Sequence, residues 1–257
     1  MFVITIPVRN AENYIERALI SALKQDHPNF RTIVIDDASN DSTIKNIEQT
    51  ISKFNDTRVT FIKNNIRVGM LANHVLFAAL CDNDDIIVNL DGDDELPHDK
   101  VLQRLEQEYN DPEVWMTYGS YEYDYESRNP NGSALGIARK VAPELHNRRH
   151  PWCSTHLRTY KKWLFSRIED DDLRRGGEYI EHAIDLAFMF PLIEMSGAEH
   201  AHFIPDILYL YNGCNPENDH KAQDPAERDR AIRQSMNYIL SQRIYPVLEK
   251  EKDYPAW

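Results

Sequence analysis

A short acidic segment, Asp91-Gly92-Asp93-Asp94, offers the clearest chemistry in this sequence. It follows the aliphatic run at residues 86–90, which predicts a strand buried on both faces. Unpaired carboxylates are too costly to bury, so they must face water or a cation. Two hard oxygen donors around one glycine suit Mg²⁺ or Mn²⁺, and we expect Gly92 to take a backbone angle that aims Asp91 and Asp93 at one point. An acidic surface turn is the alternative interpretation.

Strands and helices alternate up to this segment. Short apolar runs predict strands at residues 2–6, 32–35, 58–62 and 86–90, and amphipathic segments predict helices between them, with Asn10 as the cap of the first helix and Gly69 opening the third. This alternation predicts βαβ units, a parallel sheet and right-handed crossovers.

Polar clusters follow all of these predicted strands. They are Arg9-Asn10, Asp36-Asp37, Lys63-Asn64-Asn65 and Asp91-Gly92-Asp93. The carboxyl ends of parallel strands share one edge, where ligands usually bind, so the clusters favour a nucleotide site over a decorated surface. The absence of G-x-G-x-x-G after the first strand, and of G-x-x-x-x-G-K-[ST] anywhere, disfavours a dinucleotide-binding fold and a P-loop.

Composition limits the class of protein. The chain has 257 residues and a net charge of −13, which argues against broad binding of nucleic acid. The sequence contains no apolar run of 18 residues, so it predicts no membrane span. The first residues are typical of a strand and lack the basic flank and apolar core of a signal peptide. Three widely spaced cysteines, Cys81, Cys153 and Cys214, predict reduced thiols in a cytoplasmic protein.

The ordered set of motifs resembles the nucleotide-sugar domain of family 2 glycosyltransferases, which have the GT-A fold. The resemblance covers residues 2–120, through segments 4–10, 33–43, 65–73 and 90–94. It implies an α/β protein with a mostly parallel central sheet flanked by helices and an acceptor-side extension. Residues 1–257 would form a single GT-A domain, with residues 1–120 binding the nucleotide sugar and residues 121–257 binding the acceptor and ending in a helix.

The resemblance also implies an activity and partners. The activity is inverting transfer of a sugar from a nucleoside-diphosphate donor, most commonly a UDP-sugar, to a hydroxyl of a glycan or other acceptor. A divalent metal, Mn²⁺ or Mg²⁺, would assist by neutralising charge on the departing diphosphate.

Individual residues take roles from the family pattern. Asp91 and Asp93 would hold the metal, and Asp36 or Asp37 would hold the base. A basic residue often precedes the position of Asn73; Ala72 stands there, and Arg67 is a possible substitute. The residues that we expect to contact the donor in this half are Pro7, Arg9, Asn10, Asp36, Asp37, Asn65, Asn73, Asp91 and Gly92. Asp94 is expected to support the turn or to cap a helix.

The second half begins with a long segment, residues 119–150, that is predicted to be irregular. Its positive charge could hold a diphosphate or an anionic acceptor, or could belong to a solvated loop; the residues are Arg139, Lys140, Arg148, Arg149 and His150. In the next segment Trp152 can stack on a sugar, and His156 and Arg158 can reach phosphate oxygens. Core packing is the alternative for this cluster.

Asp185 is the candidate for the catalytic base. It lies at the predicted start of a buried helix, where the helix dipole and free amides favour a carboxylate. An inverting transfer needs one base to take the acceptor's proton, and family 2 enzymes place an acid at about this chain position. Ile184 stands where the family often has a glutamate, so Glu181 is the reserve candidate. A simple helix-start acid is the alternative.

The rest of the chain is predicted from its apolar patterns. We expect helices at residues 97–109 and 226–248, and strands at residues 114–118, 201–204 and 207–211, the last two separated by Pro205-Asp206. In the polar loop that follows, His220 is a candidate metal ligand and Asn218 a candidate donor contact, with a surface loop as the alternative.

Two other functions stay open at this stage. A nucleotidyltransferase also builds an acidic metal site on an α/β sheet, but its usual Gly-rich basic loop is missing after the first strand. A nucleotide-sugar-binding module that has lost its base is the non-enzymatic alternative.

Overall fold

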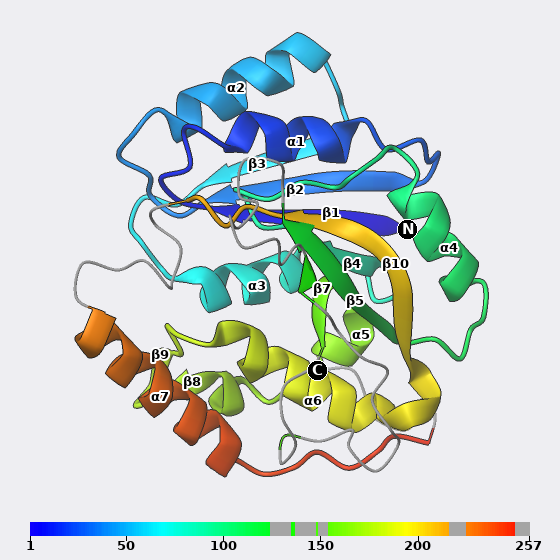
Figure 1. The fold of residues 1–257 in the computed structure, drawn as a ribbon, viewed down its shortest axis with the longest axis vertical. Coiled ribbons are helices and arrows are strands. Elements are labelled where there is room, and N and C mark those ends of the chain that lie inside the picture. The colour runs from blue at the N-terminus through cyan, green and yellow to red at the C-terminus, as the bar shows by residue number, and fades with distance from the viewer. Residues whose placement is uncertain (124–134, 137–147, 149–153, 216–224, 250–257) are drawn as a thin grey trace.

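The computed structural model describes residues 1–123, 135–136, 148, 154–215 and 225–249. An eight-stranded sheet with the order β10-β5-β7-β4-β1-β2-β3, in which β6 pairs with β5, runs through the molecule with helices on both faces (Figure 1). Its strands are β1 (Phe2–Val8), β2 (Phe30–Asp36), β3 (Val59–Lys63), β4 (Ile86–Asn89), β5 (Met116–Tyr123), β6 (Leu135–Gly136), β7 (Thr155–Lys161) and β10 (Ala201–Tyr211). A separate hairpin pairs β8 (Arg174–Arg175) with β9 (Glu178–Tyr179).

Seven α-helices and one short 3₁₀ helix are present in the described residues. They are α1 (Ile15–Leu23), α2 (Thr43–Phe54), α3 (Met70–Ala79), α4 (Val101–Tyr109), α5 (Lys162–Phe165), η2 (Asp170–Leu173), α6 (Ile184–His200) and α7 (Pro225–Ser241). None of these helices combines the length and the apolarity that crossing a membrane requires.

The first four strands confirm the prediction of parallel βαβ units. β1 pairs in parallel with both β2 and β4, and β2 pairs in parallel with β3. The carboxyl ends of β1, β2, β3 and β4 therefore share one edge of the sheet.

Strand β1 is buried on both faces because its residues alternate between two cores. Phe2, Ile4 and Ile6 belong to the core beneath α1 and α4, whereas Val3 belongs to the core that includes residues of α3 and α6. This alternation explains why the strand reads as a continuous apolar run rather than as an amphipathic one.

The second half of the chain adds its strands to the same sheet. β7 runs antiparallel to both β4 and β5 and lies between them, while β10 runs parallel to β5 on the outer side. The sequence interpretation assigned no strand to residues 155–161. The polar residues His156, Arg158 and Thr159 interrupt the apolar pattern from which a strand is predicted, although all three are buried.

Several predicted boundaries are corrected by the structure. The strand expected at residues 114–118 is β5, which includes residues 119–123 that were expected to be irregular. The helix expected from residue 97 begins at Val101. The two short strands around Pro205 are one strand, β10, with register shifts on both sides of Ile207. The last helix ends at Ser241 rather than at residue 248, and Pro246 prevents a regular helix from reaching residue 248.

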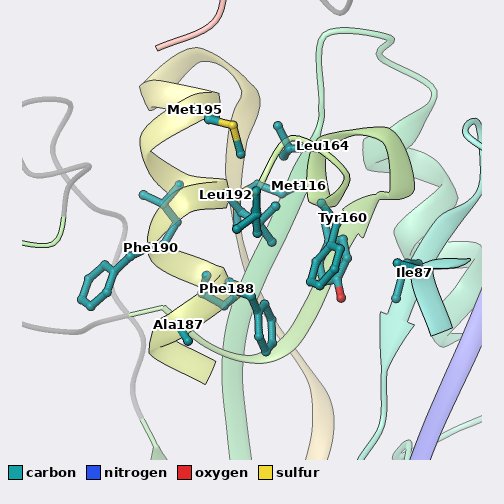
Figure 2. Packing of buried hydrophobic residues seen from close by; sticks show 14 of the residues in the cluster. Ile87, Met116, Tyr160, Leu164, Ala187, Phe188, Phe190, Leu192 and Met195 are labelled. Carbon is teal, nitrogen blue, oxygen red and sulfur yellow. The ribbon is translucent and has the colours of Figure 1, made fainter. Parts of the chain in front are cut away.

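Helix α6 packs its buried apolar residues against strands β5 and β7. Figure 2 shows Phe188, Leu192 and Met195 of this helix packed toward Met116 and Tyr160 on β5 and β7. All of these side chains are at most 1% exposed, so the packing fixes the start of α6, including Asp185, relative to the sheet.

A buried ion pair anchors the far side of α6. Two nitrogens of Arg148, Nε and Nη2, donate to the two carboxylate oxygens of Glu194 over 2.8 and 2.9 Å, and Nη1 donates to the Ile239 carbonyl over 2.9 Å. Both side chains are at most 1% exposed. Arg148 was one of the basic residues that could have held an anionic ligand. The structure corrects that interpretation, because Glu194 neutralises the Arg148 charge inside the protein.

Removing one partner of this pair should be strongly destabilising. Glu194→Gln leaves the Arg148 charge buried without its counter-charge, and we expect a loss of about 3–5 kcal/mol in the free energy of unfolding, measured by urea denaturation. Lys53→Ala, which removes an exposed pair with Glu16 at 3.8 Å, is the matched control and should change stability by less than about 1 kcal/mol. Equal effects of the two substitutions would contradict this assignment.

Candidate active site

A pocket of about 460 Å³ opens at the carboxyl edge of the parallel strands. It is lined by residues from both halves of the chain, which are brought together because β7 and α6 pack beside the end of β4. The residues predicted from the sequence that line it are Pro7, Arg9, Asp37, Arg67, Asn73, Asp91, Gly92, Asp93, His156, Arg158, Glu181 and Asp185.

Three predicted donor contacts do not line this pocket. Asp36 is fully buried and accepts a hydrogen bond from the Ser39 amide over 2.9 Å, so it shapes the loop after β2. Asn10 has a left-handed φ of 49°, and its side chain accepts from the Asn40 amide instead of capping α1. Asn65 is exposed. The residue before it, Asn64, donates to the Asp37 and Asn73 side chains over 3.0 and 2.9 Å and so supports the pocket from behind.

Asp37 is the carboxylate that reaches the pocket from β2. It accepts hydrogen bonds from the Val68 and Gly69 amides over 2.9 and 3.0 Å and from the Asn64 side chain over 3.0 Å. Burial would raise the pKa of Asp37, but these hydrogen bonds outweigh it and hold the pKa below its usual value. Asp37 is therefore a fixed anion beside the start of α3.

Gly92 is needed for close packing rather than for an unusual backbone angle. It is not among the glycines with positive φ, which corrects the reason that we predicted for it. A Cβ atom at this position would lie 2.7 Å from Cβ and Cγ2 of Val8 and 3.0 Å from the Pro7 carbonyl oxygen. The acidic turn thus lies directly against the end of β1, and this contact sets its position.

Asp94 braces the acidic turn. It is 2% exposed, and its two oxygens accept from the Tyr209 hydroxyl over 2.5 Å and from the Asn212 amide over 2.7 Å. The Tyr209 hydroxyl also accepts from the Asp91 amide over 3.2 Å. Burial and the charges of Asp93 and Asp91 raise the pKa of Asp94 well above its usual value. These contacts agree with the supporting role expected for Asp94.

Asp91 and Asp93 fit a divalent cation whose remaining ligands come from a substrate. Burial and then the charge of Asp93 raise the pKa of Asp91 to about 6, so the two carboxylates repel each other in the protein alone. Asn215 donates to Asp93 over 2.7 Å. Within the described residues no three His, Cys, Asp or Glu side chains form a metal cage, and Mg²⁺ typically takes only one or two protein carboxylates with substrate phosphates.

Asp185 lies in the first turn of α6, as predicted, and faces Arg158. Nη2 of Arg158 donates to Oδ2 of Asp185 over 3.1 Å and lies 3.3 Å from Nε2 of His156. Glu181, the reserve candidate, is exposed at the wall of the pocket before the helix begins. The ion pair holds Asp185 in one orientation at the pocket.

The two pocket histidines are uncharged. Burial and the neighbouring Arg158 charge lower the pKa of His74 to about 3 and that of His156 well below its usual value. His156 stacks on the Tyr209 ring with a centroid distance of 4.3 Å. His156 was predicted to reach a phosphate, but in this arrangement it is a neutral support for Arg158 and Tyr209.

Several candidates lie outside the described residues. They are Trp152 and His220 of the predicted site, and Arg139, Lys140, Arg149, His150 and Asn218.

The pocket also contains residues that sequence reasoning missed. Asn89 interrupts the aliphatic run before the acidic turn, and this polar residue in an apolar strand was a usable signal. His74 follows Asn73 at the start of α3 and lies within an apolar helix pattern. Tyr209 does not line the pocket but bonds Asp94 behind it, and it carries no signal of its own, because nothing in the sequence pairs β10 with the acidic turn.

A model of the family described as "Glycosyl transferase family 2" matches residues 3–173, about two thirds of the chain. This chain belongs to glycosyl transferase family 2. The match includes the parallel strands, the acidic turn and β7, and it confirms the resemblance seen in the motifs. An uncharacterised glycosyltransferase of Haemophilus influenzae is 33% identical over 120 residues, which are 47% of this chain and 46% of the relative. The chain therefore aligns with less than half of that relative's length.

Solved structures of glycosyltransferases share the fold across nearly the whole chain. S. aureus TarS 1–349 in complex with UDP-GlcNAc matches with a TM-score of 0.60 and 16% identity, covering 93% of this chain and 72% of TarS 1–349. The mannosyltransferase PcManGT from Pyrobaculum calidifontis, in complex with GDP-Man and Mn²⁺, matches with a TM-score of 0.58 and 18% identity, covering 93% and 67%. These likenesses confirm the GT-A fold of this chain.

The contact between Gly92 and Val8 leads to a testable coupling. Gly92→Ala should destabilise the protein by about 1–3 kcal/mol, because the new methyl group overlaps a rigid β-branched side chain. Val8→Ala removes the overlapping Cγ2 but keeps the Cβ at 2.7 Å, so it relieves part of the overlap and the double variant should lose less than the sum of the single variants. A double-mutant cycle by urea denaturation measures this difference. Strict additivity would contradict the contact.

Burial of neutral His74 makes stability depend on pH. Its pKa is about 3 in the folded protein against a usual value of 6.5. The unfolded chain therefore binds a proton that the folded protein does not, and stability falls as the pH drops from 6.5 towards 3. At pH 5 this proton binding lowers the free energy of unfolding by about 2 kcal/mol. Between pH 7.5 and 5.0 the wild type should therefore lose more free energy of unfolding than His74→Leu does, as measured by urea denaturation. The same loss in both proteins would contradict this prediction.

Proposed function

We propose that this chain is an inverting glycosyltransferase that moves a sugar from a UDP-sugar to a hydroxyl group of a glycan or other acceptor, assisted by Mn²⁺ or Mg²⁺. One observation carries the proposal: a single pocket holds Asp37, the Asp91–Asp93 pair and the Arg158–Asp185 pair. These groups come from four separate regions of a chain that belongs to glycosyl transferase family 2.

The pocket divides into two sides that suit two substrates. Asp37, Arg9 and Pro7 lie at the ends of β1 and β2, where a nucleoside would bind. Asp185 and Arg158 come from α6 and β7, on the side of the sheet built by the second half. We place the donor with residues 1–120 and the acceptor with residues 121–257, in one domain.

Asp185 is the proposed base. It would accept the proton of the acceptor hydroxyl as that oxygen bonds to the anomeric carbon, while the bond from this carbon to the diphosphate oxygen breaks. Attack from the face opposite the diphosphate inverts the anomeric centre. Arg158 holds one oxygen of Asp185 at 3.1 Å, so the carboxylate is positioned before the acceptor binds.

The metal would be held by Asp91 and Asp93. When bound, it neutralises the charge that develops on the departing diphosphate. The Mn²⁺ in PcManGT supports this assignment for a protein of the same fold. Gly92 and Asp94 fix the turn that carries both carboxylates.

Two alternatives remain distinguishable. A nucleotidyltransferase is disfavoured, since the family assignment and the missing Gly-rich loop both argue against it. A binding module without catalysis would bind the donor but release no UDP.

The decisive experiment is a screen of nucleotide sugars for release of UDP or GDP with MnCl₂ and with a chelator. Release that persists unchanged in the chelator would overturn the metal assignment.

Asp185→Asn separates binding from catalysis. The substitution keeps the shape of the side chain but removes its basicity, so turnover should fall by about 10²- to 10⁴-fold while the dissociation constant of the donor changes little. Steady-state kinetics and calorimetric donor binding measure the two quantities. Glu181→Gln is the matched control and should retain most activity. Full activity of Asp185→Asn would remove it from the role of base.

A further inference from the structure

The side chain of His156 contacts the supports of both the acidic turn and the proposed base. Its Nε2 atom lies 3.3 Å from Nη2 of Arg158, which donates to Asp185. Its ring stacks on Tyr209 with a centroid distance of 4.3 Å, and the Tyr209 hydroxyl donates to Asp94 of the turn. A continuous series of contacts therefore runs from the acidic turn through His156 to the base.

The orientation of Arg158 depends on the two hydrogens of its Nη2 atom. One N–H donates to Oδ2 of Asp185 over 3.1 Å, and the other faces Nε2 of His156 over 3.3 Å. The Nε atom of Arg158 is buried and has no hydrogen-bond partner among the described residues, so it does not fix the guanidinium. Because the N–H groups of a guanidinium lie in one rigid plane, an acceptor at each Nη2 hydrogen sets the direction of the bond to Asp185.

The surroundings of His156 keep its ring able to accept this hydrogen bond. The residue is 8% exposed, and the Tyr121 ring meets it edge-on at 5.7 Å while Tyr209 covers a face. Burial and then the Arg158 charge hold the pKa of His156 well below its usual value. The imidazole is therefore neutral and has one nitrogen with a lone pair, whereas a protonated ring would repel Arg158.

The relative position of the base and the acidic turn matters for an inverting transfer. The acceptor oxygen attacks from the face opposite the departing diphosphate, so the two groups must lie on opposite sides of the anomeric carbon. A displacement of about 1 Å can lower the rate about 10²-fold. Asp185 lies on α6 and the turn follows β4, so neither element alone sets the spacing between them.

We propose that His156 is a positioning residue, which sets the place of Asp185 relative to the acidic turn by accepting a hydrogen bond from Arg158 while its ring packs on Tyr209. The inference rests on the proposed function and adds a residue to it. Because His156 acts through Arg158 and Asp185, its removal affects turnover and leaves donor binding almost unchanged.

Three substitutions of His156 test the hydrogen bond separately from the ring. His156→Phe keeps a ring on Tyr209 but has no acceptor, and the shorter amide of His156→Asn falls short of Arg158. His156→Gln places an amide oxygen near the position of Nε2. We expect kcat to fall about 10- to 100-fold in the Phe and Asn variants and to recover at least in part in the Gln variant.

The measurements use the full chain with MnCl₂. Release of UDP from UDP-glucose, UDP-galactose and UDP-GlcNAc gives kcat and KM, and calorimetry with UDP gives a dissociation constant. The values of KM and of the UDP dissociation constant should stay close to those of the wild type in all three variants, because the lost contact lies on the side of the base.

A double-mutant cycle identifies Arg158 as the residue through which His156 acts. In the background of Arg158→Leu, the further substitution His156→Phe should leave kcat unchanged, since the hydrogen bond that it removes is already absent. A purely structural contribution of the imidazole would instead lower kcat again by the same factor as in the wild type.

His200→Phe is the matched control. His200 is also buried, at 6% exposed, and its ring stacks on Trp115 with a centroid distance of 3.5 Å. It does not line the pocket, so its replacement should leave kcat unchanged. Thermal unfolding of every variant at pH 7.5 shows that the proteins compared are folded at the assay temperature.

The outcomes are distinct. Wild-type turnover in the Phe and Asn variants, an equal loss in the Gln variant, a loss of UDP affinity as large as the loss of kcat, or an additive double variant would each overturn the positioning role and leave the proposed function in place. A wild type that releases no UDP or GDP from any nucleotide sugar would overturn the proposed function, and this inference would fall with it.

Discussion

The hydrogen bond from the Tyr209 hydroxyl to the Asp94 carboxylate joins two parts of the chain that are 115 positions apart. It ties the acidic turn after β4 to β10, and paired backbone hydrogen bonds between Glu95 and Leu210 reinforce the same junction. Asp91 and Asp93 project from this turn, so their positions depend on β10. The candidate active site is therefore a property of the whole sheet, although its most recognisable residues belong to the first ninety positions.

The first half of the fold could be predicted because local pattern and global structure agree there. The aliphatic runs are strands buried on both faces, and each helix between them has one apolar face. In the second half β5, α6, β10 and α7 match predicted elements with shifted bounds, whereas β7 was missed. Strand β7 carries His156 and Arg158 on a buried strand, and such polar residues hide a period of two.

The site was predictable where a residue acts through its own chemistry, and less so where it acts through a neighbour. Asp91, Asp93 and Asp185 are carboxylates at the ends of elements, and the structure brings them to one pocket. Gly92 was identified correctly as special but for the wrong reason, because its close approach to Val8 depends on tertiary packing. Tyr209 could not be found, since its partner lies in a distant segment.

The position of β7 between β4 and β5 has a consequence for the order in which the protein can be made. Domains generally fold from the N-terminus during synthesis, and contacts between distant segments must wait for the later segment to leave the ribosome. The first four strands can assemble early, but the edge of β4 has no neighbour on one side until β7 has been synthesised. The acidic turn stays unbraced until β10 follows. A nascent chain thus acquires its carboxylates early and their geometry late, which delays formation of the complete pocket until almost the whole sheet is present.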